Sequence, residues 1–222
     1  MYGEKLIIAI DGPAGSGKST TAKIIARELG ISYLDTGSMY RAVTAYFIDN
    51  NYSIESDDFC DTVNSIVIKI SDSANNQLVL LNNKDLTDRL RDHDVSLLVS
   101  KISSNKIIRD RMVLIQRMIS KDKSIVIDGR DIGTVVFPNA NYKFFITAGI
   151  KERALRRYRE LSLNGKNINL IDIEKEISHR DYLDSTRENS PLKKANDAIV
   201  VDTTHLDIDG QVNTILKIIN NN

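Results

Sequence analysis

The sequence of 222 residues is poor in cysteine and in aromatic residues: it has one cysteine, Cys60, no tryptophan, and only 6% aromatic residues. A lone cysteine excludes an internal disulfide and a cysteine-based metal cluster, and it suits a reducing compartment. We expect Cys60 to be a buried or idle thiol. Few aromatic side chains disfavour a surface on which nucleic-acid bases stack. The sequence therefore predicts a cytoplasmic protein that does not bind nucleic acid.

The sequence also lacks a net charge and a long apolar run. Lysine plus arginine and aspartate plus glutamate number 30 each, so no overall field attracts the chain to nucleic acid or to an acidic membrane. The apolar run near the N-terminus, Leu6–Ile10, is far shorter than the roughly 18 residues that a membrane span needs. No long exposed apolar stripe stands out, so we expect a monomer that does not associate with membranes.

Apolar runs and helical periodicity alternate along most of the chain. Short runs rich in isoleucine and valine, apolar on both faces, are typical of parallel strands that helices cover, and segments with apolar residues three and four apart separate them. This alternation predicts a three-layer α/β core with a parallel sheet, and the length fits one such domain with a small insert. The expected strands are 6–10, 32–34, 124–127, 143–147 and 198–201, and the expected helices are 20–29, 105–119, 151–163 and 211–219.

Residues 64–90 break this alternation. Asn64–Ile70 and Gln77–Leu81 are β-rich runs joined by the polar stretch 71–76. Two such runs around a polar turn indicate a hairpin that stands apart from the main sheet. We therefore predict a semi-independent, β-rich insert at about 40–95.

Residues 12–19, GPAGSGKS, match the pattern G-x-x-x-x-G-K-[ST] between an expected strand and an expected helix. The glycines let backbone N–H groups turn inward around phosphate, and the helix N-terminus adds positive potential. In such a loop Lys18 reaches the β and γ phosphates, and Ser19 can hold Mg²⁺. The sequence predicts a nucleoside triphosphate site formed by Gly12, Pro13, Ala14, Gly15, Ser16, Gly17, Lys18, Ser19 and Thr20.

This loop leaves three classes of protein open: a phosphotransferase with a small acceptor, a GTPase switch, and an ATP-driven mechanical or regulatory module. A guanine-specific GTPase needs an N-K-x-D element, and the nearest match, Asn83-Lys84-Asp85-Leu86, has leucine at the base-reading position. A mechanical ATPase usually brings further domains for which this chain has no room. The sequence favours the phosphotransferase.

Two groups of arginines fit the anions of such a reaction. Arg41 lies one helical turn after the glycine-containing turn in DTGSMYR, where a guanidinium could bind an incoming phosphate in bidentate fashion. Arg153, Arg156 and Arg157 share one helical face, either around an anion or as a solvated face paired with Glu152 and Glu160. With the polar stretch 164–167 as a mobile loop, they indicate a lid that closes over the triphosphate and excludes water.

Three charged residues, Asp128, Arg130 and Asp131, follow the expected strand 124–127. The carboxyl ends of parallel strands are where open α/β sheets bind ligands. We therefore expect these charges to belong to the acceptor site. Phosphoryl transfer needs positioning and charge stabilisation more than a general base, and the three histidines, His93, His179 and His205, share no catalytic spacing.

With these residues together, the sequence resembles the bacterial cytidylate kinases, nucleoside monophosphate kinases of the P-loop superfamily. Six ordered blocks over nearly the whole length carry the resemblance: AIDGPAGSGKST, YLDTGSMYRA, VSKISSNKIIRDRMVLIQR, VIDGRDIGTVVFPNA, ERALRRYRE and RDYLDSTRENSPLKKANDAIVVDTT. It implies transfer of the γ-phosphate of ATP to CMP or dCMP with Mg²⁺. It also implies a P-loop core (1–40, 96–150 and 176–222), a monophosphate-binding domain with the β-rich insert (41–95) and a helical lid (151–175).

The resemblance also implies roles for individual residues. Asp131 would attract the C4 amine of cytosine and repel the carbonyl of uracil, with Arg109 and Ser100 beside it. Arg180, Asp184 and Arg187, at i, i+4 and i+7, would share one helical face. The implied substrate-binding residues are Thr36, Gly37, Arg41, Ser100, Arg109, Arg130, Asp131, Arg180, Asp184 and Arg187; the catalytic ones are Lys18, Arg130, Arg153, Arg157 and Arg187; and Ser19 is the metal ligand.

Two alternatives stay open from the sequence alone: a kinase for another small acceptor such as UMP, and a regulatory module that binds ATP without turnover. The role of Asp128 is also open, because its carboxylate could serve the Mg²⁺ site or orient Arg130.

Overall fold

The computed structural model describes residues 5–72, 77–163 and 169–221. The chain divides into two compact units, one formed by Met1–Leu34 with Ser120–Asn222 and the other by Asp35–Ile119. None of the described helices has the length and hydropathy that a membrane span requires.

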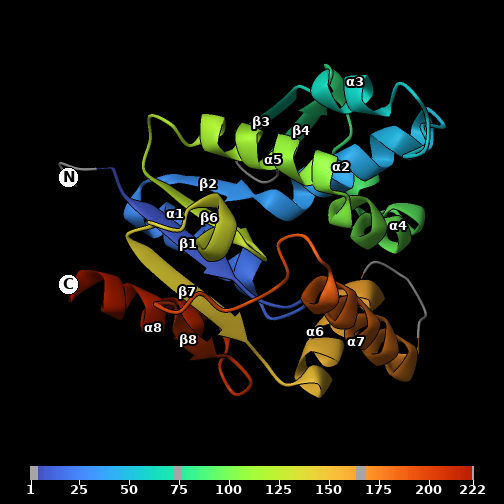
Figure 1. The fold of residues 1–222 in the computed structure, drawn as a ribbon. Helices are drawn as coiled ribbons and strands as arrows, with labels where there is room; N and C mark the ends of the chain where they lie inside the picture. The colour runs from blue at the N-terminus through green and yellow to red at the C-terminus, as the bar shows by residue number, and fades with distance from the viewer. Residues whose placement is uncertain (1–4, 73–76, 164–168, 222) are drawn as a thin grey trace. The chain divides into compact units, whose positions relative to one another are not determined.

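The first unit is built on a five-stranded sheet with the order β2-β6-β1-β7-β8 (Figure 1). β1 pairs in parallel with both β6 and β7, and β7 pairs in parallel with β8. Every residue of β6 is buried, which explains why its sequence is apolar on both faces. The strands span Ile7–Asp11 (β1), Ser32–Asp35 (β2), Ile125–Gly129 (β6), Tyr142–Thr147 (β7) and Ile199–Asp202 (β8).

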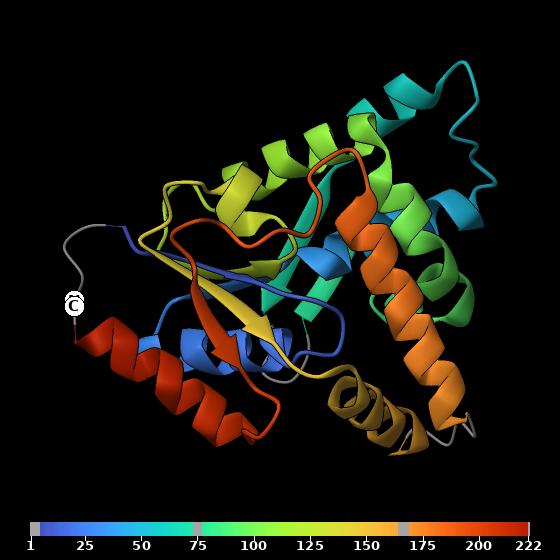
Figure 2. The same cartoon turned by 60° about the horizontal axis from the view of Figure 1, so that its bottom comes forward.

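Helices α1 (Lys18–Leu29) and α8 (Ile208–Asn220) lie side by side against one face of this sheet (Figures 1 and 2). Ile25 of α1 and Ile215 of α8 are fully buried in a core that includes Ile8 and Ile10 of β1. Gly30 ends α1 in the left-handed conformation, and its N–H donates to the carbonyls of Ala26 and Arg27, as is common at helix C-termini.

Helices α6 (Ile150–Leu163) and α7 (Leu170–Thr186) pack on each other in the same unit (Figure 2). They share a small apolar cluster made of Ala154, Ile173 and Ile177. The helix predicted at 151–163 is therefore confirmed, whereas the predicted loop at 164–167 lies outside the described residues. α7 ends at Thr186, so Arg187 is not on the helical face on which its spacing placed it.

The second unit combines helices with a separate antiparallel sheet of order β3-β4-β5. This confirms the predicted hairpin apart from the main sheet, although 64–67 were wrongly included in its first strand, because α3 extends to Asn64 and β3 begins at Ile68. Gly37, expected in a turn, lies in the first turn of α2. The elements are α2 (Thr36–Asp49), α3 (Phe59–Asn64), β3 (Ile68–Asp72), β4 (Gln77–Leu81), β5 (Lys84–Asp85), a 3₁₀ turn (Asp88–Arg91), α4 (His93–Ser104) and α5 (Lys106–Ile119).

Cys60 on α3 is an exposed thiol, which overturns the first half of the expectation of a buried or idle one; that it is idle stays a prediction. The α/β class, the parallel sheet flanked by helices and the β-rich insert are confirmed. The functional boundaries at 41, 96, 151 and 176 stay predictions.

Candidate active site

Two loops leave the carboxyl ends of adjacent parallel strands in the first unit. Asp11 at the end of β1 is paired in register with Gly129 at the end of β6. The phosphate loop, residues 12–19, follows β1, and a second segment, which we call the charged loop (residues 130–136), follows β6. Ligands of open α/β sheets bind at such an edge.

The backbone of the phosphate loop requires glycine. Gly12 has φ 156°, and a Cβ built there would lie 2.1 Å from the carbonyl oxygen of Ile146. Gly15 has φ 74°, a conformation that L side chains rarely adopt. Both positions allow the backbone to curl tightly, which is what brings N–H groups around a phosphate.

Lys18 and Ser19 begin α1 directly after this loop. The Lys18 ammonium, largely buried, donates to the carbonyl of Pro13 at 3.2 Å. The Ser19 hydroxyl donates to Asp128 Oδ2 at 2.7 Å, and the Tyr33 hydroxyl donates to Asp128 Oδ1 at 2.8 Å. Asp128 is therefore a buried residue of β6 that contacts the phosphate loop through Ser19. Of the remaining predicted loop residues, Gly12, Pro13 and Ser16 are buried, Ala14 and Gly17 are half-buried, and Thr20 is exposed.

A hydroxyl and a carboxylate in contact fit Mg²⁺, because this ion takes oxygen ligands and usually needs only one or two carboxylates beside substrate phosphates. Across residues 5–72, 77–163 and 169–221, no cluster of three or more His, Cys, Asp or Glu side chains is placed to hold a metal ion. Ser19 and Asp128 thus form a candidate pair of ligands for this ion.

The predicted arginine cluster of α6 has an acceptor for each member. Arg153 donates to the carbonyl of Ala14 at 3.0 Å and also pairs with Asp181 of α7. Arg156 donates to the carbonyl of Thr203 at 2.6 Å and pairs with Glu152, and Arg157 pairs with Glu160. A carboxylate next to each arginine therefore compensates the repulsion among the three positive charges. Arg153 also holds the backbone of the phosphate loop through its hydrogen bond to Ala14.

The charged loop brings four predicted residues together. Arg130 Nε donates to Asp184 Oδ2 at 2.9 Å, and Arg187 lies 3.9 Å from Asp131 and 4.0 Å from Asp184. The side chains of Asp131, Asp184 and Arg187 are each 6% exposed. Burial would raise the pKa of Asp184, but the nearby guanidinium groups, Arg130 first and then Arg180, lower it overall. The carboxylate of Asp184 is thus held ionised between cations.

Arg187 reaches this cluster because the chain leaves the helix. Its backbone is extended at the C-cap of α7, with φ −61° and ψ 142°, and its Nε donates to the carbonyl of Ser190 at 2.7 Å. The ion pairs with Asp131 and Asp184 are tertiary contacts, which helical spacing does not reveal.

Asp11, which the sequence analysis did not single out, contacts the charged loop. Its carboxylate accepts from the backbone N–H of Ile132 and of Gly133, both at 2.8 Å. Burial raises the pKa of Asp11 to about 6, against the lowering effect of the two backbone hydrogen bonds. A signal was present, because Asp11 is an acid at the end of an apolar strand, as Asp128 is.

The second unit holds five further predicted substrate-binding residues, Thr36, Gly37, Arg41, Ser100 and Arg109, whereas Arg180 lies on α7 of the first unit. Arg109 is 2% exposed; it donates to the carbonyl of Ser103 at 3.0 Å and lies over the ring of Tyr40, 5.3 Å from its centroid. The hydroxyl of Ser103 donates to the carbonyl of Ser100, one turn earlier on α4. Thr36, Gly37 and Arg41 lie on the first two turns of α2, whose N-cap Asp35 accepts from the N–H of Ser38.

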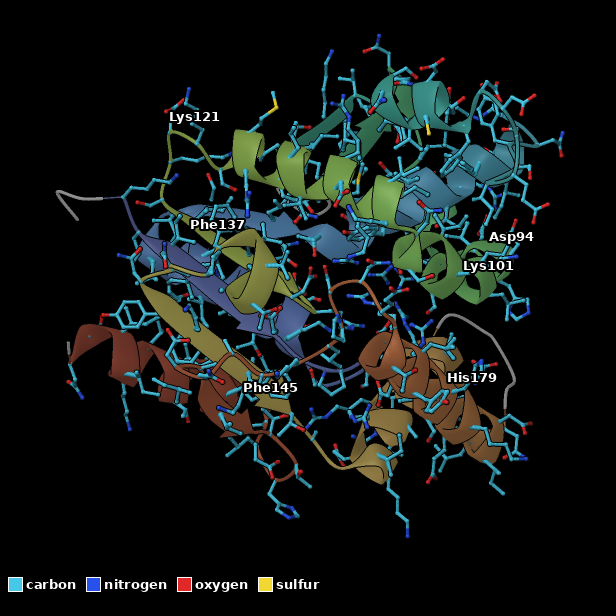
Figure 3. All side chains as sticks on the ribbon, in the orientation of Figure 1. Asp94, Lys101, Lys121, Phe137, Phe145 and His179 are labelled. Carbon is cyan, nitrogen blue, oxygen red and sulfur yellow. The ribbon has the colours of Figure 1, made fainter. Side chains whose placement is uncertain are left out.

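The histidines have no place in these clusters. His179, for example, is an exposed residue of α7 (Figure 3). Besides Asp11, the residues that sequence reasoning missed are Tyr33, which holds Asp128, and Asp181, which links Arg153 to the N–H of Ala14.

The family model and the curated relatives that match this sequence all carry the same description. Residues 8–221 match the family model described as Cytidylate kinase. The curated Cytidylate kinase of Carboxydothermus hydrogenoformans is 48% identical over 213 residues, covering 96% of each chain. That of Fusobacterium nucleatum subsp. nucleatum is 46% identical over 214 residues, covering 96% of this chain and 97% of the relative.

Among solved structures, shikimate kinase from Acinetobacter baumannii, in complex with shikimate, superposes with a TM-score of 0.52 and 14% identity, over 98% of this chain and 94% of that one. An uncharacterized protein from Eubacterium ventriosum superposes with a TM-score of 0.54, also at 14% identity. At this identity the likeness shows the fold alone, an α/β P-loop NTPase fold.

Proposed function

Because the chain belongs to the cytidylate kinase family, we propose that it transfers the γ-phosphate of ATP to CMP or dCMP, giving ADP and CDP or dCDP, in pyrimidine nucleotide metabolism. The observation that carries the proposal at the site is the charged loop: Asp131, a buried carboxylate beside Arg187, stands next to Arg130 at the end of β6. The adjacent strand, β1, leads into the phosphate loop.

On the donor side, the phosphate loop binds ATP through its inward-turned N–H groups, with Lys18 on the β and γ phosphates. Ser19 and Asp128 would hold Mg²⁺, and the direct contact of the Asp128 carboxylate with Ser19 supports a role for Asp128 at the metal site. A bound Mg²⁺ supplies positive charge that offsets the charge of the phosphates. Arg153, fixed against Ala14, and Arg157, half-exposed beside Glu160, add positive charge from α6 toward the same phosphates.

On the acceptor side, Arg41 and Arg130 bind the phosphate of the monophosphate, because guanidinium groups match phosphate oxygens in bidentate geometry, and Arg187 acts on the reacting phosphates. Arg180 and Asp184 bind the ribose and phosphate end. Thr36 and Gly37, in the first turn of α2, are assigned to the substrate on position alone.

Selection of cytosine depends on Asp131. A carboxylate accepts from the C4 amine of cytosine, whereas the C4 carbonyl of uracil would face it with a second acceptor. Arg109 donates to N3 or O2, and Ser100 can act in either sense. Each buried mismatch costs about 1–3 kcal/mol, which is roughly a five- to 150-fold discrimination against UMP.

No residue needs to act as a strong base in this scheme. Phosphoryl transfer is accelerated mainly by in-line positioning and by charge stabilisation. The described site supplies this through buried cations and dipoles, with Asp184 held ionised to orient Arg130.

The test is a coupled ADP-release assay with ATP and a panel of acceptors: CMP, dCMP, UMP, AMP, GMP and shikimate. We expect CMP and dCMP to give the highest kcat/KM. Release that is fastest with UMP or shikimate would contradict the cytosine assignment, and release no faster than with water for all acceptors would favour an ATP-binding module without turnover.

We also propose a monomeric enzyme of the cytoplasm. The single cysteine supports a reducing compartment. Contrary to the expectation that no apolar stripe is exposed, Ile107, Leu114 and Met118 of α5 are 38%, 48% and 66% exposed. Light scattering at increasing protein concentration tests the monomer, and a mass that doubles would overturn it.

A further inference from the structure

The charged loop forms a single π-helical turn, Ile132–Val136, which ends before Phe137 (Figure 3). Asp131 is at the N-cap of this turn, and its backbone carbonyl accepts from the N–H of Val135 at 2.8 Å and of Val136 at 3.2 Å. The first N–H groups of a helical turn have no partner within the turn itself. In this protein Asp11 of β1 accepts from two of them, those of Ile132 and Gly133.

An aspartate at an N-cap usually folds its own carboxylate back onto the second or third N–H of the helix. Within the described turn, Asp131 makes no such side-chain cap. Asp11 already accepts from the N–H of Gly133, which is one of the two groups on which Asp131 would close. The carboxylate of Asp131 instead faces Arg187 at 3.9 Å.

We propose that Asp11 is a positioning residue for base selection: it caps the turn in place of Asp131 and so keeps the Asp131 carboxylate turned toward Arg187, the orientation in which it would accept from the cytosine amine. This inference rests on the proposed function and deepens it. Asp11 comes from a strand that precedes the turn by about 120 residues in the chain, and both of its hydrogen bonds have the 2.8 Å length of good backbone contacts.

Burial of the Asp11 carboxylate costs desolvation free energy, which a solvent-exposed aspartate would not lose. Asp11 is 5% exposed, and a buried carboxylate needs hydrogen bonds to remain ionised. A Cβ at Gly133 would lie 3.4 Å from Asp11 Oδ2, in ordinary van der Waals contact, so the turn is held by the two hydrogen bonds and not by a requirement for glycine. The site thus has an aspartate after each of two adjacent strands. Asp11 binds the backbone N–H groups of the turn, and Asp131 is proposed to bind the base.

The experiment measures kcat/KM for CMP and for UMP, and KM for ATP, in wild type, Asp11→Asn, Asp131→Asn and the double variant. Asparagine keeps the shape but offers one acceptor and an amide donor that would face a backbone N–H. We expect Asp11→Asn to lower the CMP-to-UMP ratio about tenfold while KM for ATP changes less than twofold. If Asp11 acts through Asp131, the double variant has the same ratio as Asp131→Asn alone.

Asp207→Asn is the matched control, because Asp207 caps α8 by accepting from the N–H of Gly210 at 2.8 Å, away from the charged loop. Its ratio should equal that of wild type. An Asp11→Asn ratio equal to wild type, or a double variant whose losses add, would overturn the inference. If Asp11→Asn does not fold, Asp11→Glu carries the test: it keeps the charge but moves the carboxylate by one methylene, so a lowered ratio supports the proposal and an unchanged ratio contradicts it. A wild type without a preference for CMP would instead count against the proposed function itself.

Discussion

The phosphate loop and the charged loop leave neighbouring strands of one sheet, yet they are built in different ways. The phosphate loop depends on its own backbone, with Gly12 and Gly15 in conformations that only glycine adopts readily. The charged loop depends on distant side chains, because Asp11 binds its N–H groups and Asp184 and Arg187 surround its charges. A triphosphate site common to many enzymes can therefore be local, whereas the site for one particular acceptor is assembled from the tertiary structure.

The largest effect is expected in the phosphate loop. Lys18→Ala should lower kcat by about 10³-fold or more, because a buried cation on the transferred phosphate is lost. CMP affinity, measured by calorimetry, should stay within about twofold if the two loops act separately.

Lys23→Ala, an exposed lysine on the same helix, is the control and should keep full activity. Turnover of Lys18→Ala within tenfold of wild type would contradict the mechanism, and lost CMP binding would show that the two loops are not separable.

A second prediction compares one glycine from each strand end. Gly12→Ala should lower the free energy of unfolding by about 3 kcal/mol or more, because its Cβ would clash with a backbone oxygen at 2.1 Å. Gly133→Ala should cost about 1 kcal/mol or less, since its nearest neighbour, at 3.3 Å, is a lysine methylene.

Gly30→Ala separates backbone strain from the clash. Gly30 also has a positive φ, 64°, but among the described residues no heavy atom lies within 4 Å of a Cβ built there. Its cost should be about 1–2 kcal/mol. Urea unfolding measures all three, and equal losses at Gly12 and Gly133 would show that the charged loop needs its backbone as much as the phosphate loop does.

The two buried acids that contact or flank the charged loop should respond oppositely to pH. The pKa of Asp11 is raised to about 6, mainly by burial and also by Asp131, with Arg130 opposing. Its contribution to stability is complete below the unfolded pKa of about 3.9 and is lost as pH rises through about 6, a change of roughly 2–3 kcal/mol. The pKa of Asp184 is lowered by its arginines despite burial, so its contribution is present above about 3.9 and is lost as pH falls.

Urea unfolding from about pH 2.5 to pH 7 measures this, with Asp11→Asn and Asp184→Asn as references, because the change at Asp184 falls below its unfolded pKa of about 3.9 and the change at Asp11 above it. The stability of wild type relative to Asp11→Asn should fall as pH rises, and relative to Asp184→Asn it should rise. The same sign for both would refute the assigned protonation behaviour.

The smallest effect tests Asp128, which connects β6 to the phosphate loop. Asp128 lies in β6 but contacts Ser19 of the phosphate loop, and Tyr33 holds its other oxygen. Tyr33→Phe removes the hydrogen bond that orients Asp128, which should weaken the binding free energy of Mg²⁺ by about 0.5–1.5 kcal/mol. The Mg²⁺ concentration for half-maximal rate should then rise about two- to tenfold.

Tyr142→Phe is the matched control, because the Tyr142 hydroxyl donates to the carbonyl of Ile219 at the end of α8. An equal Mg²⁺ dependence in both variants would remove Tyr33 from the metal site.

The difference between the loops also explains what the sequence could predict. The phosphate loop was found from spacing, since its glycines, Lys18 and Ser19 are consecutive and their geometry is local. The strands and most helices followed from apolar periodicity for the same reason. The sequence analysis placed Arg187 on a helical face, but the helix ends at Thr186. Residue spacing does not reveal where a helix ends or which tertiary ion pairs form beyond its end.

The charged loop needed more than its own residues. Its charges at the end of a strand pointed to a site, but the roles of Arg130 and Asp131 came from the family resemblance, and the sequence could not choose between two roles for Asp128. Tertiary contacts supplied what was missing: Ser19 and Tyr33 on Asp128, and Asp11 on the backbone of the loop.

The most direct measurement is the CMP-to-UMP ratio of kcat/KM in wild type and in Asp131→Asn, with the fold of the variant checked by thermal unfolding. The account predicts a wild type that prefers CMP and a folded variant whose ratio is lower by roughly five- to 150-fold, equal to about 1–3 kcal/mol. An unchanged ratio in the folded variant would contradict the claim that this carboxylate selects cytosine.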